Sequence, residues 1–182
     1  FAEGPSDHAF LSPVLSRLCT VLCVQAADAL VEVGPMHELH SPDALRGASR
    51  EERILEAARA AQGEWTVLFV HADGGGDPDA ARVERTEPAA QRIAQELGDA
   101  RQRSVAVIPV RETEAWVLAD GEAVRAAFGT RRSEAELGLP RRPRDVEGLQ
   151  EPKQAIENAF RIARGDRISR KERPVARFAL IG

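Results

Sequence analysis

Three groups of acidic side chains lie where predicted strands end. They are Glu3, then Asp73 with Asp77, then Glu112 with Glu114. The carboxyl ends of parallel strands share one edge of a sheet, which is where ligands gather in open α/β folds. Carboxylates brought together repel one another unless a cation lies among them or one is protonated. Oxygen ligands suit Mg²⁺ or Mn²⁺, and these ions activate water for phosphodiester displacement.

All of these acids except Asp73 also have a plain structural interpretation. Glu3 precedes glycine, a common turn, and Asp77 precedes proline, which is typical of a helix cap. Glu112 and Glu114 could lie at an exposed helix start, where acids favour the helix dipole. Asp73 precedes three glycines that would let a ligand approach the backbone.

His71 follows the same predicted strand as Asp73, two residues earlier in the chain. Its imidazole could bind a metal, carry a proton, or pack as a buried side chain. The residue type does not decide among the three, and they stay open at this point.

The elements that must position these residues alternate between strand and helix. Near-continuous apolar runs at 65–70 and 105–108 predict strands buried on both faces, the second ending near Val110, and a third strand is predicted at 29–33. Helices are predicted at 5–22, 49–61, 78–97, 111–118, 120–129 and 152–164. This order predicts an α/β fold with a mainly parallel central sheet flanked by helices.

Charge divides the chain into an acidic body and a basic tail. Residues 1–129 hold 12 Arg, no Lys and 21 Asp plus Glu, whereas residues 130–182 hold 13 Arg plus Lys and 8 acids. We expect a metal-binding core at 1–129 and a basic, mainly helical extension at 130–182 packed on the same domain. This charge pattern is typical of a cation site beside a phosphate-binding surface, but an ordinary solvated surface can have it as well, so both interpretations stay open.

Composition excludes several function classes. The chain has no tyrosine, so no phosphotyrosyl intermediate can form on it. No secretory signal or apolar run of membrane-spanning length is apparent, which predicts a cytoplasmic protein with no membrane partner. Cys19 and Cys23 are expected to be reduced thiols. Phe1 and Ala2 are expected to be the end of a strand whose beginning is missing.

Three segments resemble a known family. Glu3-Gly4-Pro5-Ser6-Asp7 and the strand ending in His71-Ala72-Asp73 are similar to the TOPRIM domain, which pairs a strand-end Glu-Gly with a later Asp-x-Asp. The stretch 108–120, with Glu112-Thr113-Glu114-Ala115-Trp116, resembles an uncharacterised TOPRIM-like family related to OLD-type nucleases and often encoded beside ATPases in phage-defence loci. Pro152-Lys153 also fits its pattern, and the resemblance runs from Glu3 to about Lys171.

This resemblance implies a Rossmann-like TOPRIM fold and a nuclease that depends on Mg²⁺ or Mn²⁺. Glu3, Asp73 and either Glu112 or Glu114 would hold the metal, and Asp77 or Glu114 would be the place for a second cation. His71 departs from the pattern, because it stands where the family has an aspartate. The basic residues expected along a DNA or RNA backbone are Lys153, Arg161, Arg164, Arg167, Arg170 and Lys171.

Two other functions stay open. The chain could be a catalytically inactive TOPRIM-like binding or regulatory subunit of an ATPase complex, an alternative that His71 favours. It could also be an enzyme that handles nucleotides or phosphate esters on a Rossmann-like sheet, with the loop at 36–48 forming part of the substrate pocket. A homodimer is compatible with each of these functions.

Overall fold

The computed structural model describes residues 1–26, 31–98 and 103–165. Within these ranges the chain forms two compact units. The first comprises residues 1–72 and 83–107, and the second comprises residues 73–82 and 108–165. The expected boundary at residue 129 is not where the units divide, because the helices on both sides of it share one apolar core.

The first unit is built on two parallel strands, β1 (Val67–His71) and β2 (Arg103–Val107). Their register pairs Val67 with Arg103 and His71 with Val107, which confirms the predicted parallel pairing. On the other edge of β1, the Phe1 nitrogen donates to the Phe69 carbonyl and the His71 N–H donates to the Phe1 carbonyl, both at 2.9 Å. Phe1 therefore pairs with β1 as a parallel neighbour would.

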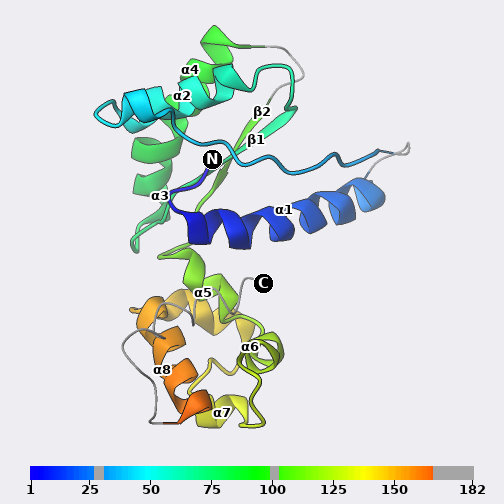
Figure 1. Ribbon diagram of the computed structural model, residues 1–182, viewed down its shortest axis with the longest axis vertical. Helices are drawn as coiled ribbons and strands as arrows, with labels where there is room; N and C mark the ends of the chain where they lie inside the picture. Colours follow the sequence, from blue (N-terminus) through cyan, green and yellow to red (C-terminus); the bar gives the residue numbers. More distant parts are fainter. Residues whose placement is uncertain (27–30, 99–102, 166–182) are drawn as a thin grey trace. The chain divides into compact units, whose positions relative to one another are not determined.

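Helices cover both faces of this small sheet (Figure 1). Leu68 and Val70 point to one face, where they pack with α2 (Arg50–Ala60) and α4 (Glu87–Glu96). Phe69 and His71 point to the other face, beside α1 (Pro5–Ala26). This alternation is the two-residue period of a strand, and it gives the unit a helix–sheet–helix arrangement.

Local signals begin and end the helices of this unit. Ser49 accepts the Glu52 N–H at 3.1 Å and so caps α2, as the sequence predicts. A short 3₁₀ helix (Asp43–Leu45) precedes it. A π-helical turn (Arg82–Thr86) leads into α4, where Pro88 has no N–H to continue the α-helical pattern. In contrast to the prediction, residues 31–33 have no regular structure, while residues 29 and 30 lie outside the described ranges.

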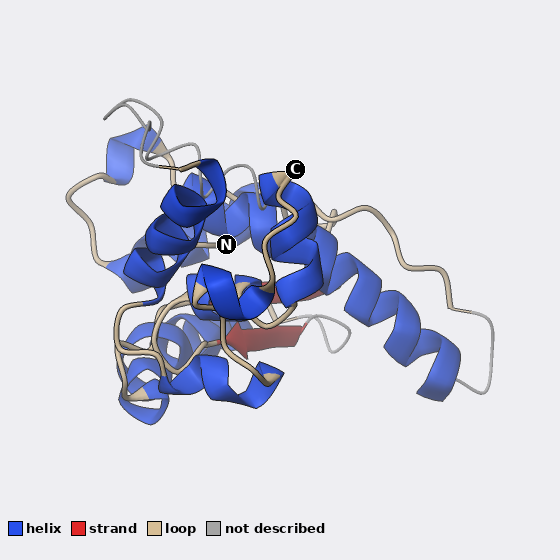
Figure 2. Cartoon of the chain, turned by 90° about the horizontal axis from the view of Figure 1, so that it is seen from below, coloured by secondary structure: helices blue, strands red, loops and turns tan. Residues whose placement is uncertain are grey.

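The second unit is helical in its described part. Its helices are α3 (Pro78–Ala81), α5 (Thr113–Val117), α6 (Gly121–Phe128), α7 (Glu134–Leu137), a 3₁₀ helix (Pro143–Gly148) and α8 (Pro152–Arg164). Leu118, Phe128 and Ile156 lie in its apolar core, and the Phe128 and Phe160 rings meet edge to face at 5.1 Å. Helices therefore make up most of the described chain (Figure 2).

Strand β2 begins at Arg103 and ends at Val107, earlier than the predicted end near Val110. Pro109 cannot donate to a neighbouring strand, and the carbonyls of residues 109–111 instead accept hydrogen bonds from the glycine loop 74–76. The apolar run therefore continues past the sheet as extended chain of the second unit.

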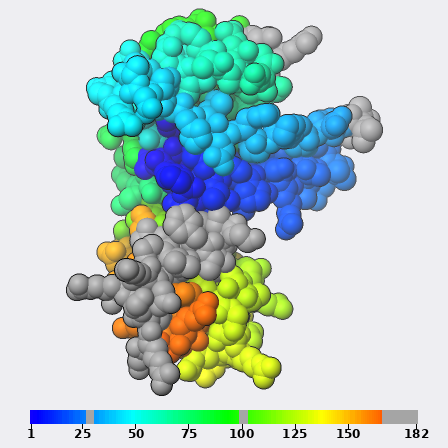
Figure 3. All heavy atoms as spheres, viewed as in Figure 1, coloured from blue at the N-terminus to red at the C-terminus, as the bar shows by residue number. Residues whose placement is uncertain are grey.

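Helix α1 is continuous through Pro13, and it extends to Ala26, beyond the end predicted at residue 22. Its 22 residues include a window of mean hydropathy 1.5, which meets the length and composition of a membrane-spanning helix. One such helix near an N-terminus is weak evidence, because core helices of other proteins meet the same criteria. The space-filling view shows α1 as a ridge, with the segment that follows residue 31 lying along it (Figure 3).

Candidate functional site

The glycine loop after β1 places Asp73 in the second unit. Gly74 and Gly76 donate to the carbonyls of Pro109 and Val110, at 3.1 and 2.7 Å. A Cβ atom on Gly74 would lie only 2.4 Å from the Pro109 oxygen, so the backbones could not approach this closely with a side chain there. This pairing fixes Asp73 beside the chain that carries Glu112.

Three carboxylates lie around Lys153 at this place: Asp73, Glu112 and Glu114, which we call the acidic cluster. The Asp73 side chain accepts the Thr113 N–H at 3.3 Å. Lys153, at the start of α8, places its ammonium 2.8 Å from Glu112 and 3.9 Å from Glu114. Glu114 is only 8% exposed, whereas the Lys153 side chain is partly open to solvent. The structure thus brings together three predicted metal ligands and one predicted nucleic-acid contact.

The acidic cluster acts on the ionisation of Lys153. Burial lowers the pKa of Lys153, while its hydrogen bond to Glu112 and the charges of Glu114 and Asp73 raise it, and the net pKa lies above the ordinary 10.5. The lysine is therefore a fixed positive charge among three acids at neutral pH.

The cluster has the donor chemistry of a Mg²⁺ or Mn²⁺ site, since all its side chains offer carboxylate oxygens. Across residues 1–26, 31–98 and 103–165, no three His, Cys, Asp or Glu side chains are already grouped to hold a metal ion. Lys153 instead provides the positive charge. The donor types fit a hard divalent cation, and its binding would exchange with the lysine contact.

Glu147 is a site residue that the sequence analysis missed. Its carboxylate accepts the Trp116 indole N–H at 2.5 Å and the Val110 N–H at 3.2 Å. It thereby ties α5 to the segment that precedes Glu112. The sequence indicates that Trp116 needs a hydrogen-bond partner, because a packed indole N–H usually has one. It does not show that the partner is Glu147, which lies 31 residues further along the chain.

Glu3 and His71 belong to the first unit, whereas the acidic cluster belongs to the second. The Glu3 carboxylate forms ion pairs with Arg50, at 3.1 Å, and with Arg85. The His71 side chain is 1% exposed, and its carbonyl accepts from the Arg50 guanidinium. Burial of His71 matches the packed interpretation left open by the sequence. A metal site that joins Glu3 to Asp73 stays a prediction.

The other predicted site residues have separate places. Asp77 caps α3 by accepting the Ala80 N–H at 2.9 Å. On α8, Arg161 donates to Asn158, and Arg164 lies over the Phe160 ring. Arg167, Arg170 and Lys171 lie outside the described residues.

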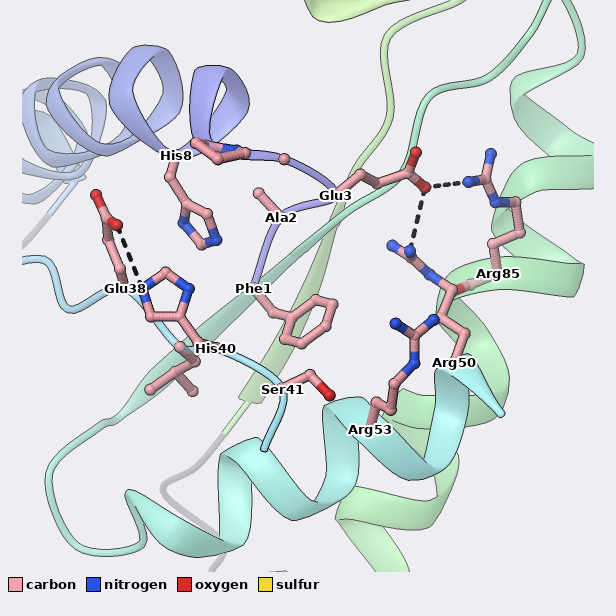
Figure 4. Close-up of a pocket in the computed structure, with 13 residues that line it drawn as sticks. Phe1, Ala2, Glu3, His8, Glu38, His40, Ser41, Arg50, Arg53 and Arg85 are labelled. Carbon is pink, nitrogen blue, oxygen red and sulfur yellow. Dashed lines mark hydrogen bonds and ion pairs between the residues drawn. The ribbon is translucent and has the colours of Figure 1, made fainter. Parts of the chain in front are cut away.

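The first unit also holds a cavity of about 500 Å³ (Figure 4). We call it the arginine cavity, because Arg50, Arg53 and Arg85 line it together with Glu3. The loop that follows Met36 contributes residues 38–41, so the predicted loop at 36–48 does line a pocket. No sequence motif had pointed to this group of arginines, which α2 and the π-helical turn bring together.

Comparison with known proteins gives one informative result. The model of a family described as a domain of unknown function, DUF4276, matches residues 2–173. No curated protein and no solved structure matches the chain.

Proposed function

Because the chain belongs to the DUF4276 family of domains of unknown function, we propose its function from the site: a divalent-metal-dependent TOPRIM-like nuclease that hydrolyses phosphodiester bonds in DNA or RNA. The observation that supports this best is the acidic cluster around Lys153. A Rossmann-like TOPRIM fold, a cytoplasmic location and a role in phage defence beside an ATPase belong to the same proposal.

Within this proposal, Asp73, Glu112 and Glu114 would hold Mg²⁺ or Mn²⁺. When bound, the cation supplies positive charge at the phosphate and lowers the pKa of a bound water. The Thr113 N–H orients Asp73, and the hydrogen bonds of Glu147 hold the segment that carries Glu112. Lys153 would turn its ammonium from Glu112 to a phosphate oxygen, which a flexible four-carbon side chain allows.

Lys153, Arg161 and Arg164 lie on one helix and offer positive charge to a nucleic-acid backbone. Contacts of this kind would be salt-dependent and largely blind to base sequence.

The decisive experiment measures cation binding and cleavage in the same variants. Wild type, Asp73→Asn and Glu112→Gln are titrated with Mn²⁺ by calorimetry, then assayed on single-stranded DNA, duplex DNA and RNA with Mg²⁺ or Mn²⁺. We expect both variants to lose Mn²⁺ binding and cleavage. Asp145→Asn is the matched control, because Asp145 pairs with the exposed Arg142 in the same unit, at the start of the 3₁₀ helix. Wild-type Mn²⁺ affinity in Asp73→Asn would place the cation elsewhere.

An inactive TOPRIM-like binding subunit is the second candidate. Its supporting observation is that the predicted acids Glu3, Glu112 and Glu114 each have a basic partner, while His71 is buried. Absence of cleavage by wild type with every substrate and cation, alone or with a neighbouring ATPase, would favour this function over the nuclease.

A further inference from the structure

We propose that the arginine cavity of the first unit binds a phosphate monoester, either of a nucleotide or at the end of a nucleic-acid strand. This inference goes beyond the proposed nuclease function and needs neither a metal nor hydrolysis. It rests on the charge, the hydrogen bonds and the size of the cavity.

The charge of the cavity favours an anion. Its lining contains three arginines and two glutamates, Glu3 and Glu38. Glu3 is shared by Arg50 and Arg85, and Glu38 lies 3.6 Å from His40. Arg53 therefore faces the cavity with a positive charge that no carboxylate of the described chain balances (Figure 4).

Arg53 is the central observation. Its Nε is buried and has no hydrogen-bond partner within the described chain. Burying a polar group without a partner is unfavourable, so a small turn of the guanidinium that brings Nε to a ligand oxygen would strengthen binding. The backbone of Arg53 is fixed, because the next turn of α2 buries Ile54, Leu55 and Ala58 in the core of the first unit.

Arg50 is already held in a binding orientation. Its guanidinium and Nε donate to the carbonyls of His71 and Arg85, the latter at 3.2 Å, while one terminal nitrogen pairs with Glu3. A planar guanidinium fixed in this way loses little freedom when it binds a phosphate. Arg85 reaches the same carboxylate from the π-helical turn, a rare conformation that is frequent at functional sites.

The ligand class follows from the competition with Glu3. A carboxylate ligand carries one charge and would replace Glu3 with no gain. A phosphate monoester carries about −1.5 to −2 at neutral pH and has three strong acceptor oxygens, so it can engage Arg53 as well as the two paired arginines.

The cavity has room for more than the phosphate. Its volume of about 500 Å³ matches pockets that take whole small molecules. The Phe1, His8 and His40 rings line it beyond the arginines, and the two histidine rings lie 5.0 Å apart. Flat rings of this kind suit a nucleobase, which they can contact by stacking.

The test measures binding to the full chain in EDTA by calorimetry. The probes are inorganic phosphate, AMP, adenosine, and a short oligonucleotide with either a 5′-phosphate or a 5′-hydroxyl. We expect AMP or the 5′-phosphorylated oligonucleotide to bind at least about tenfold more tightly than its unphosphorylated partner, as loss of a charged hydrogen-bond group predicts. Whether AMP or the oligonucleotide binds more tightly distinguishes a free nucleotide from a strand end.

Variants place the ligand in the cavity. Arg53→Gln should weaken phosphate binding by about tenfold or more, and Arg53→Lys should weaken it less. Arg59→Gln is the matched control, because Arg59 lies on the same helix and pairs with Glu56 and Glu96 outside the cavity. Glu3→Gln removes the carboxylate that competes for Arg50 and Arg85, so it should tighten phosphate binding. The nuclease proposal predicts no increase in cleavage for this variant.

The proposal is overturned if no phosphate probe binds wild type at millimolar concentration. Equal affinity of Arg53→Gln and Arg59→Gln for AMP would also overturn it, as would equal binding of AMP and adenosine. Retained phosphate binding with no cleavage would leave this inference intact and contradict only the nuclease. Circular dichroism of each variant confirms that the fold survives.

Discussion

Replacing Lys153 by methionine tests the acidic cluster most directly, because one side chain balances three acids. The ammonium lies 2.8 Å from Glu112 and 3.9 Å from Glu114, and its own side chain is 38% exposed. A hydrogen bond to a charged group contributes about 1.5–3 kcal/mol, and solvent screening at this exposure reduces that to about 1–2 kcal/mol. We therefore expect Lys153→Met to lower the free energy of unfolding by about 1–2 kcal/mol.

Urea unfolding followed by circular dichroism measures this change. The raised pKa of Lys153 means that its stabilising contribution is complete below the ordinary pKa of 10.5 and is lost as the pH rises through the higher folded value. The difference between wild type and Lys153→Met should therefore stay constant from pH 7 to pH 9. Arg142→Met, which removes the exposed pair with Asp145, is the matched control and should change stability much less.

Adding Mn²⁺ extends the same experiment to the proposed metal site. Without the lysine, a bound cation would balance the carboxylates, and a ligand at one hundred times its Kd stabilises a fold by about 2.7 kcal/mol. We expect Mn²⁺ to restore Lys153→Met to at least wild-type stability, and EDTA to reverse this. Unchanged stability of Lys153→Met would refute the ion-pair reasoning. A loss that Mn²⁺ does not restore would refute the cation site.

Four further predictions use the same unfolding assay unless stated. Gly74→Ala should cost about 1–3 kcal/mol, because its Cβ would overlap backbone oxygens, whereas Gly148→Ala, with open space around it, should not. Trp116→Phe should cost about 1–3 kcal/mol by leaving a carboxylate without its indole donor. Burial first, then the positive charge of the Phe1 amino group, lowers the pKa of His8 below 6.5 in the folded protein. The unfolded chain therefore takes up the proton first as the pH falls from 7 to 5, so wild type should lose stability over this range and His8→Gln should lose less. Lys153→Arg should bind Mn²⁺, measured by calorimetry, more weakly than wild type.

Local signals in the sequence predicted much of the fold. The capped helix after Ser49 and the helix from Pro152 to Arg164 are confirmed, because each depends on residues within a few positions. The strand predicted at 65–70 is also found, at Val67–His71. The strand expected at 29–33 rested on a short apolar run, and its described part remains irregular. Short runs of this kind do not distinguish a strand from a loop that packs along a helix.

The candidate sites were predictable only in part, for a related reason. Residue type and strand ends indicated Asp73, Glu112 and Glu114. The contact of Lys153 with Glu112 spans 41 residues, and no local pattern shows such a pair. The arginine cavity combines α2 with a π-helical turn that no periodicity predicts, so Arg53 could not be distinguished from an ordinary surface arginine.

The use of lysine at position 153 connects the charge of the acidic cluster with its chemistry. The chain has 25 basic residues, and only Lys153 and Lys171 are lysine. The planar guanidinium of an arginine would bind Glu112 through two parallel hydrogen bonds, and it is more weakly hydrated than an ammonium. Arginine therefore suits a permanent ion pair, such as that of Arg50 with Glu3. Lysine is a compact charge that exchanges partners on a flexible stem. A site that exchanges its own ammonium for an incoming cation or phosphate, as we propose for the acidic cluster, needs the second kind of charge.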